Sequence, residues 1–148
     1  MSEHRVQVRW ERKGVDFGYE SYPRDHEWRF EGGVLVPASA APAFRGDPER
    51  VDPEAAFVAA LSSCHMLTFL AIASRKRLVV ETYEDDALGF LAKNDAGKLA
   101  MTRVVLRPRV VFAGAPPPAE QVAELHERSH RECFIANSVV TLVEVEAR

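Results

Sequence analysis

One long apolar segment, residues 52–77, sets the strongest limit on how this chain can fold. Asp52 is a helix-capping residue type whose carboxylate accepts hydrogen bonds from the free N–H groups of the first turn, and Pro53 suits the first helical position. Glu54 lies at the positive end of the helix dipole, and Arg75 lies at the negative end with two further basic residues. The sequence therefore predicts a single helix over residues 52–77.

A helix that is apolar on all sides must be covered by other protein or by lipid. The run from Ala55 to Ala73 is nearly long enough to cross a bilayer. It is rich in alanine, however, and the Ser-Ser-Cys-His sequence at 62–65 interrupts it, so we expect a buried helix and no membrane span. Cys64 then lies in the middle of that helix, where it is either an ordinary small core residue or a reactive thiol.

The chain length and composition predict one globular domain over residues 1–148. The apolar fraction of 47% and the charged fraction of 28% are ordinary for a soluble protein. The net charge of −3 gives no electrostatic reason to expect nucleic acid or an anionic membrane as a partner. The first residues contain no apolar signal-peptide core, and two cysteines are too few for a disulfide scaffold, so we expect a cytoplasmic protein.

Shorter patterned segments surround this helix and predict an α+β fold. Strands are expected at 6–10, 28–30, 34–36, 78–83, 87–93, 99–112 and 138–145. Gly32 and Gly33 form the turn of a hairpin, and residues 37–51 are an irregular connection. Pro108 implies a bend, a bulge or an edge position within its long strand. A second helix is expected at 118–132, so the order of elements favours mostly antiparallel pairing over a βαβ array.

The second helix contains two histidines at the spacing of a metal site. His126 and His130 lie one turn apart on the same helix face, and the His-Glu-x-x-His sequence at 126–130 matches the motif by which zinc peptidases hold their metal. Cys133 has the spacing of a third ligand. The opposing interpretation is a solvated helix face, because Arg128 and Arg131 lie nearby. Metal binding through these three residues is therefore kept only as an alternative.

The residues around both cysteines resemble the OsmC/Ohr family, the osmotically inducible and organic-hydroperoxide-resistance proteins. The family helix begins with Asn/Asp-Pro-Glu, and its glutamate lies ten positions before the first cysteine, as Glu54 does before Cys64 here. The second family cysteine comes late, on or just after the second helix, where this chain has Cys133 in the sequence RECFIANSV. The family arginine from the N-terminal hairpin matches Arg24 in YPRDHEW.

This resemblance implies a fold, an activity and a set of site residues. The fold is an intertwined homodimer with central apolar helices, mostly antiparallel sheets outside and active sites at the subunit interface. The activity is that of a thiol-dependent peroxidase, which reduces organic hydroperoxides and is regenerated by an external dithiol, of lipoyl type in the best-known branch, with no bound cofactor or metal. The site residues are then Cys64 as the attacking thiol, Cys133 as the resolving thiol, Arg24 as the thiolate partner and Glu54 as the residue that orients the arginine. Arg29 and Arg45 are near enough in sequence to be alternatives to Arg24.

Elementary chemistry explains why such a site needs two thiols and a cation. Peroxide oxidises a thiolate to a sulfenic acid, and a second thiol condenses with it to give a disulfide. A buried thiol resists ionisation, so a positive charge must stabilise the thiolate. The helix N-terminus is too distant, since Cys64 lies eleven residues after Pro53, or about 16 Å along the axis. A guanidinium, which stays charged at any working pH, is the better candidate.

The spacing of Glu54 and Cys64 bears on the assembly of this site. On one straight helix they differ by about 15 Å along the axis and by about 80° around it. They can share a site only if the helix is broken between them or if a second subunit brings them together. A dimer also explains how so apolar a helix is covered. The apolar residues around Cys64, such as Leu61 and Leu67, favour an alkyl hydroperoxide over hydrogen peroxide.

His65 departs from the resemblance, because the best-known family members have an aromatic residue, usually Phe, after the first cysteine. An imidazole at this position either assists the thiolate and the leaving alkoxide or satisfies a buried polar contact. The departure leaves a second class of function open: a non-catalytic OsmC-like dimer that binds an apolar small molecule beside an unreactive Cys64.

Overall fold

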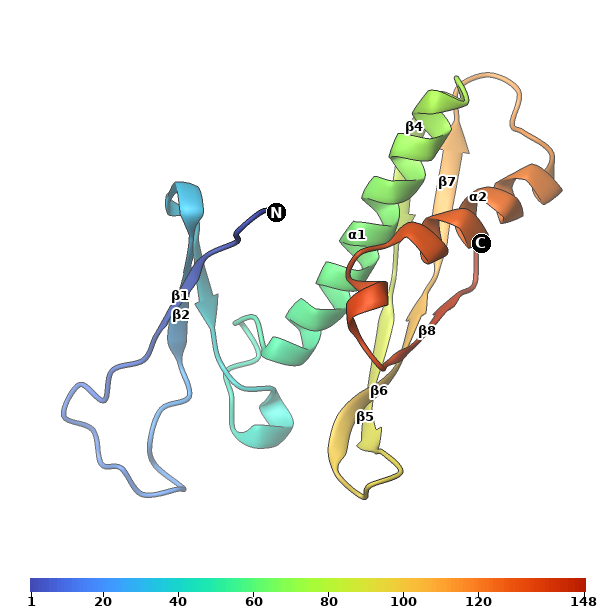
Figure 1. Cartoon of the computed structure of the whole chain (residues 1–148). Helices are drawn as coiled ribbons and strands as arrows, with labels where there is room; N and C mark the ends of the chain where they lie inside the picture. The colour runs from blue at the N-terminus through green and yellow to red at the C-terminus, as the bar shows by residue number, and fades with distance from the viewer. The chain divides into compact units, whose positions relative to one another are not determined.

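The computed structural model describes all 148 residues and divides the chain into two compact units, Met1–Ala56 and Phe57–Arg148 (Figure 1). It contains two α-helices and eight β-strands, most of them paired antiparallel, so the predicted α+β class is confirmed. The expectation of one domain over residues 1–148 stays a prediction.

The N-terminal unit holds a three-stranded antiparallel sheet in the order β1–β2–β3. Its strands are β1 (Val6–Arg9), β2 (His26–Phe30) and β3 (Leu35–Ala38). The chain turns between β2 and β3 through Gly32 and Gly33, whose φ angles of 83° and 84° favour glycine, so the predicted hairpin is confirmed. The expectation that the first strand is half-buried is wrong for the single chain, because every residue of β1 is exposed.

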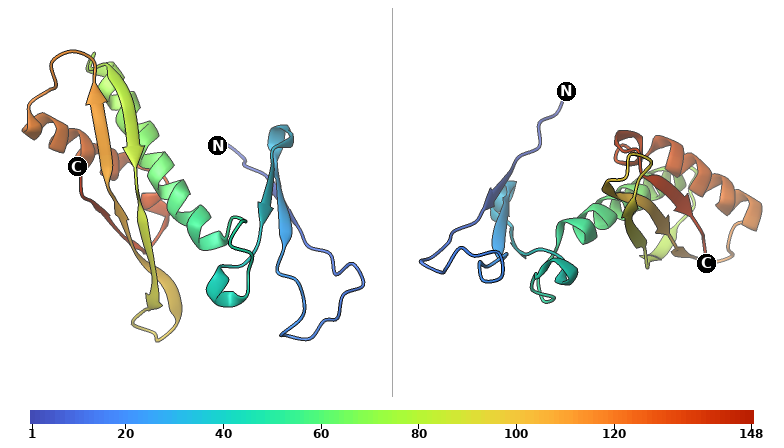
Figure 2. Two further views of the ribbon diagram at one scale, coloured as in Figure 1. Left: turned by 180° about the vertical axis from the view of Figure 1, so that it is seen from behind. Right: turned by 90° about the horizontal axis from the view of Figure 1, so that it is seen from below.

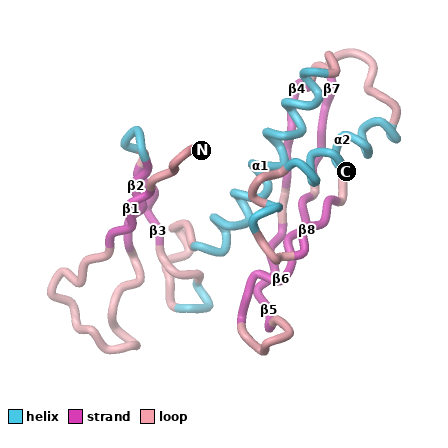
Figure 3. The backbone as a smooth tube through the Cα atoms, viewed as in Figure 1, coloured by secondary structure: helices cyan, strands magenta, loops and turns pink.

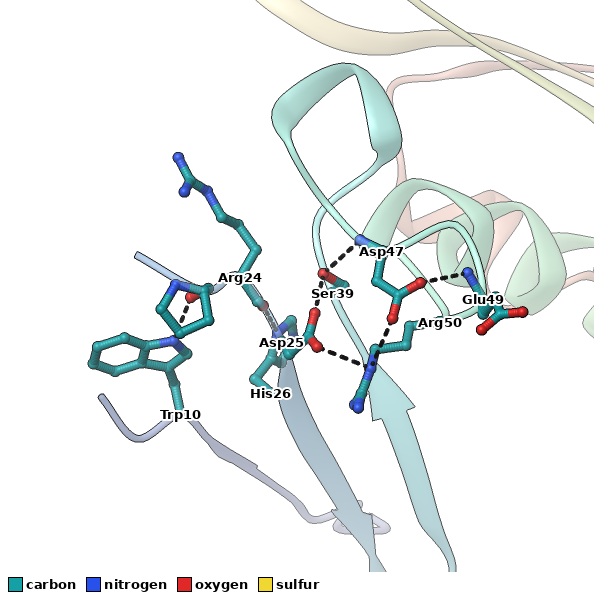
Figure 4. Close-up of polar contacts among 9 residues, drawn as sticks. Trp10, Arg24, Asp25, His26, Ser39, Asp47, Glu49 and Arg50 are labelled. Carbon is teal, nitrogen blue, oxygen red and sulfur yellow. Dashed lines mark hydrogen bonds and ion pairs between the residues drawn. The ribbon is translucent and has the colours of Figure 1, made fainter. Parts of the chain in front are cut away.

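A polar network organises the irregular connection that follows β3 (Figure 4). The fully buried Ser39 donates its hydroxyl proton to Asp25 at 2.9 Å and accepts from the Asp47 N–H at 3.1 Å. Arg50 then pairs with both carboxylates, at 3.2 Å and 3.4 Å. These bonds give the segment before the first helix a defined path although it contains little regular structure.

α1 (Pro53–Arg75) is the predicted central helix, and it begins and ends as its sequence dictates. The Asp52 carboxylate accepts from the Ala55 N–H at 2.8 Å, which is the expected N-cap. At the other end Arg77 takes a left-handed backbone conformation (φ 59°), which stops the helix. The helix is therefore a local consequence of its own capping residues and apolar interior.

The chain alone covers only one face of α1. The buried residues recur at helical spacing: Leu61, His65, Phe69, Ile72 and Ala73. Leu67, on another face, is 60% exposed. By length and mean hydropathy (1.9) α1 also meets the criteria for a membrane span, which is weak evidence because core helices of soluble proteins meet them too. Much of an apolar helix thus remains uncovered by the chain itself.

Two small sheets make up the β-structure of the C-terminal unit. They pair β4 (Val80–Asp85) with β7 (Pro108–Phe112), and place β6 (Leu99–Leu106) between β5 (Leu88–Lys93) and β8 (Leu142–Val145). The predicted strand over 99–112 is therefore two strands, and the chain passes between the sheets at Arg107, just before Pro108 (Figure 3). β8 runs parallel to β6 and is shorter than the predicted strand at 138–145.

Two apolar cores hold the helices of this unit on its sheets. α2 (Ala119–Glu132) confirms the second predicted helix. The first core consists of Phe69, Ile72, Ala73 and Leu125. The second core consists of Leu61, Val104 and Leu106. Seen from behind in Figure 2, β4 and β7 lie side by side along α1, and this packing leaves the α1 surface near Cys64 free for a site.

Candidate active site

Cys64 lies near the middle of α1 and is partly exposed. It lines a groove of about 780 Å³ whose walls come from α1 and from the segment after α2. Apolar side chains, including Leu67, Phe134 and Ile135, form much of these walls. Phe134 is 81% exposed in the single chain. The Cys64 thiol is therefore reached from solvent through an apolar groove.

Cys133 is the C-cap residue of α2, and its side chain is 1% exposed. Its backbone leaves the helical region (φ −69°, ψ 115°), which ends α2 and leads into a short 3-10 turn at Ala136–Ser138. The Ala136 N–H donates a hydrogen bond to the Cys133 sulfur at 3.5 Å. The helix end and the turn after it thus fix the position of this sulfur.

The two thiols are free and lie beside each other. Burial raises the pKa of the Cys133 thiol to about 11, and the neighbouring Cys64 side chain adds to this increase. The pair therefore consists of an enclosed, protonated thiol and a more accessible sulfur next to it.

This arrangement suits reversible disulfide chemistry. Two cysteines whose side chains are neighbours can form a disulfide with little movement of the backbone. An oxidant that reaches Cys64 through the groove produces a sulfenic acid whose nearest thiol is Cys133. The structure thus brings together two cysteines that lie almost seventy residues apart in the sequence.

Arg24 belongs to the N-terminal unit, where its own loop holds the guanidinium. It donates to the carbonyl oxygens of Tyr19, at 2.6 Å, and Tyr22. Its Cζ atom lies 3.7 Å from the centre of the Tyr22 ring, which is a cation–π contact. In Figure 4 the side chain points away from the polar network drawn beside it. No carboxylate pairs with Arg24, and its role beside Cys64 stays a prediction.

The two alternative arginines of the same unit both have acidic partners. Arg29 pairs with Glu27 at 3.6 Å, and Arg45 pairs with Glu20. Such exposed pairs add little stability, but they neutralise part of the charge that a thiolate needs nearby. Of the three arginines, Arg24 has the charge least committed to a carboxylate.

Glu54 lies in the first turn of α1, and its carboxylate Oε2 is buried without a hydrogen-bond partner. α1 is one helix from Pro53 to Arg75, so Glu54 and Cys64 lie about 15 Å apart along its axis. The sequence left two ways for Glu54 and Cys64 to share a site: a broken helix or a second subunit. The continuous α1 excludes the broken helix. The single chain does not bring Glu54 to Cys64.

His65 is bonded to the second helix and not to the neighbouring thiol. Its Nε2 lies 3.1 Å from His126 Nδ1, and the two rings are nearly parallel, at 7°. The side chains are 1% and 4% exposed, and burial lowers the pKa of each imidazole to about 4. Sequence reasoning did not find this partnership. Its one signal was a histidine on an otherwise apolar helix face, which requires a polar partner elsewhere.

The alternative of a metal site on His126, His130 and Cys133 is wrong. No group of three or more His, Cys, Asp or Glu side chains in the chain is arranged to hold a metal ion. The physical reason is that the residues serve different partners, since His126 bonds to His65 and Cys133 lies beside Cys64.

Comparison with known proteins gives a consistent result for the fold. The family model described as OsmC-like protein matches residues 46–148. An OsmC-like protein of unknown function from Vibrio cholerae is 49% identical to this chain, covers 100% of both chains and has a TM-score of 0.96. None of the curated proteins matches the chain.

More distant solved structures share the fold alone. An organic hydroperoxide resistance protein from Elizabethkingia anophelis is 15% identical over 99% of this chain and 94% of its own, with a TM-score of 0.73. The organic hydroperoxide resistance protein OhrB of Bacillus subtilis is 16% identical over 99% and 98%, with a TM-score of 0.68. At such identities the similarity establishes the architecture, and the chemistry must be argued from the site.

Proposed function

Because this chain belongs to the OsmC-like protein family, we propose that it is a thiol-dependent peroxidase that reduces organic hydroperoxides to alcohols. Two proteins that share its fold are described as organic hydroperoxide resistance proteins. The observation that carries the proposal is the position of the Cys133 thiol beside Cys64. A two-thiol peroxidase needs its resolving sulfur beside the attacking one, because the sulfenic acid must be captured before it is oxidised further.

The proposed reaction has two steps at sulfur. The Cys64 thiolate attacks the terminal oxygen of ROOH, the O–O bond breaks, and Cys64 becomes a sulfenic acid while RO⁻ takes a proton and leaves as ROH. The Cys133 sulfur then attacks the sulfenic sulfur, and water leaves as the disulfide forms. An external dithiol, of lipoyl type in the best-known branch of the family, restores both thiols by exchange and is itself oxidised to a disulfide.

The unequal surroundings of the two sulfurs support this order of events. Cys64 lines the groove, whereas Cys133 is 1% exposed and has a raised pKa, so a dissolved peroxide meets Cys64 first. The access to Cys64 through the groove and the burial of Cys133 favour Cys64 as the attacking thiol and Cys133 as the resolving thiol.

A second copy of the chain is proposed to complete the site. Members of this family are typically dimeric. Beside the groove, Leu67 and Phe134 are exposed apolar side chains of the kind that association buries. Arg24 has no carboxylate partner, and Glu54 lies too far along its own helix to reach Cys64. We assign Arg24 to the thiolate and Glu54 to the orientation of the arginine in the site that a dimer forms.

The groove supports an alkyl hydroperoxide as the substrate. Its volume of about 780 Å³ and its apolar walls suit a molecule with a hydrocarbon chain better than hydrogen peroxide. A thiol pair that must be reduced after each turnover also works best in a reducing compartment, which favours the cytoplasm.

Mass spectrometry after one equivalent of cumene hydroperoxide tests the proposal. The wild-type chain is expected to lose both thiols as an intrachain disulfide and to release one equivalent of alcohol. Cys64→Ser abolishes turnover, whereas Cys133→Ser completes the first turnover and accumulates a sulfenate. An equal loss of the first turnover in both variants contradicts the assigned roles. Two untouched thiols in the wild type favour the other class of function, a non-catalytic dimer that binds an apolar molecule in the groove.

A further inference from the structure

We propose that His65 and His126 are positioning residues, whose mutual hydrogen bond sets α2 on α1 so that Cys133 meets Cys64. This inference rests on the proposed function for its biological purpose, but its geometry stands independently. The bond joins the residue after one cysteine to a residue two turns before the other. It is the one side-chain hydrogen bond that joins α1 to α2.

The two contacts together fix α2 where one contact alone does not. On α1, Cys64 and His65 are adjacent, about 1.5 Å apart along the axis and about 100° apart around it. On α2, His126 and Cys133 are seven residues apart, about 10 Å along the axis and on nearly the same face. The cysteine contact at the end of α2 and the apolar packing of Leu125 leave some freedom in the orientation of that helix. The directional imidazole bond two turns earlier removes this freedom.

The surroundings of the pair indicate that it serves geometry more than stability. Both rings are buried, yet His65 Nδ1 and His126 Nε2 have no hydrogen-bond partner, which is costly in an apolar interior. Phe69 lies against His126 at 4.5 Å between ring centres, so an apolar side chain would also pack there. Buried polar pairs that are only partly satisfied are often replaceable by apolar residues without loss of stability. What such a pair supplies is one specific register.

Leucine at both positions separates positioning from stability. In His65→Leu/His126→Leu the urea midpoint is expected to stay unchanged or to rise. The rate of disulfide closure by diamide is expected to fall about tenfold or more, because a small misplacement of reacting atoms has a large effect on rate. Diamide takes up two electrons and two protons at its N=N bond as the two thiols become a disulfide, so this readout requires no peroxide.

Two further variants complete the comparison. His65→Gln/His126→Asn places amide groups where Nε2 and Nδ1 lie and is expected to restore closure to near the wild-type rate. Leu125→Val weakens the same helix interface within the first apolar core, so it is expected to lower the urea midpoint and leave closure unchanged. If the leucine pair does not fold, the single variants His65→Leu and His126→Leu are measured against the same criterion.

Closure at the wild-type rate in the leucine variants overturns the inference. Slow closure in Leu125→Val also overturns it, because any loosening of the helices then has the same effect. Failure of the proposed function gives a different result. Cumene hydroperoxide then leaves both thiols of the wild type intact, although diamide still closes the disulfide and the variants still differ in closure rate as expected.

Discussion

Ser62 of α1 donates its hydroxyl proton to Asp85 Oδ2 at the end of β4. The other oxygen of the same carboxylate, Oδ1, accepts from the Arg107 backbone N–H at 2.7 Å, where the chain passes from one sheet to the other. One side chain therefore ties the helix that carries Cys64 to both sheets of the C-terminal unit. It does so two residues before Cys64, so it also fixes the position of that helix near the thiol.

Asp85→Ala is expected to lower the free energy of unfolding by about 2–3 kcal/mol, because it leaves the Arg107 N–H and the Ser62 hydroxyl without an acceptor. Ser62→Ala removes one bond and leaves the other intact, so its expected cost is about 1 kcal/mol. Urea denaturation of both variants measures the difference. Equal costs would mean that the Arg107 bond contributes nothing to stability.

The two thiols are expected to react with iodoacetamide at very different rates. At pH 8 the Cys133 pKa of about 11 leaves a thiolate fraction of roughly one in a thousand, and the side chain is 1% exposed. Cys64 is partly exposed and lines the groove, so it is modified first. Peptide mapping during the reaction identifies the modified residue. If Cys133 is modified first, its burial at the end of α2 does not protect the thiol, and the prediction is wrong.

The histidine pair predicts a loss of stability in mild acid. The folded chain lowers the pKa of His65 and His126 from 6.5 to about 4, so between these values the unfolded chain binds more protons. The penalty for protonating the buried pair is absent above pH 6.5 and lowers the stability as the pH falls towards 4. Each pKa unit corresponds to about 1.4 kcal/mol, which makes the effect about 3 kcal/mol for each histidine. The neighbouring His130 also lowers the pKa of His65, whereas Asp85 raises the pKa of His126.

Urea midpoints measured from pH 7.5 to pH 4 test this expectation. In His65→Leu/His126→Leu the dependence over that window is expected to flatten. The exposed carboxylates of Asp86 and Glu132, whose pKa values their arginine partners lower, contribute mainly at more acidic pH and serve as an internal reference. An unchanged slope in the double variant would assign the acid sensitivity to other groups.

Arg24→Met is expected to slow the first turnover with cumene hydroperoxide by about tenfold or more, because the proposed site loses the charge that stabilises the thiolate. Arg29→Met is the matched control, since Arg29 lies on the same hairpin and pairs with Glu27 at 3.6 Å. Quenched-flow measurement of alcohol release gives both rates. Equal rates in the two variants would remove Arg24 from the site.

Local signals in the sequence predicted the elements well. Asp52 and the basic residues after Arg75 bracket α1, Gly32 and Gly33 place the first hairpin, and Pro108 marks the point where the long strand divides. Each of these signals acts through the backbone within a few residues, by capping, by a positive φ or by a missing N–H. The structure around such residues therefore follows from the local sequence.

Contacts between distant residues were not predictable in this way. The Asp85 bridge, the His65–His126 bond and the parallel pairing of β8 each depend on the packing of elements far apart in the chain. The pairing of Cys64 with Cys133 was expected from the resemblance, and the proximity of the two side chains is a product of tertiary packing. The arginine and glutamate assignments depend on a second subunit, which the packing of one chain does not determine.

The parallel pairing of β8 with β6 also affects how the protein is made. It joins Arg103 to Leu142, and the Arg148 N–H at the chain end donates to the Pro108 carbonyl at 2.9 Å. Contacts between such distant positions form late in folding. A nascent chain synthesised only as far as Thr141 therefore carries both sulfurs but lacks the strand that completes the sheet beneath the second core.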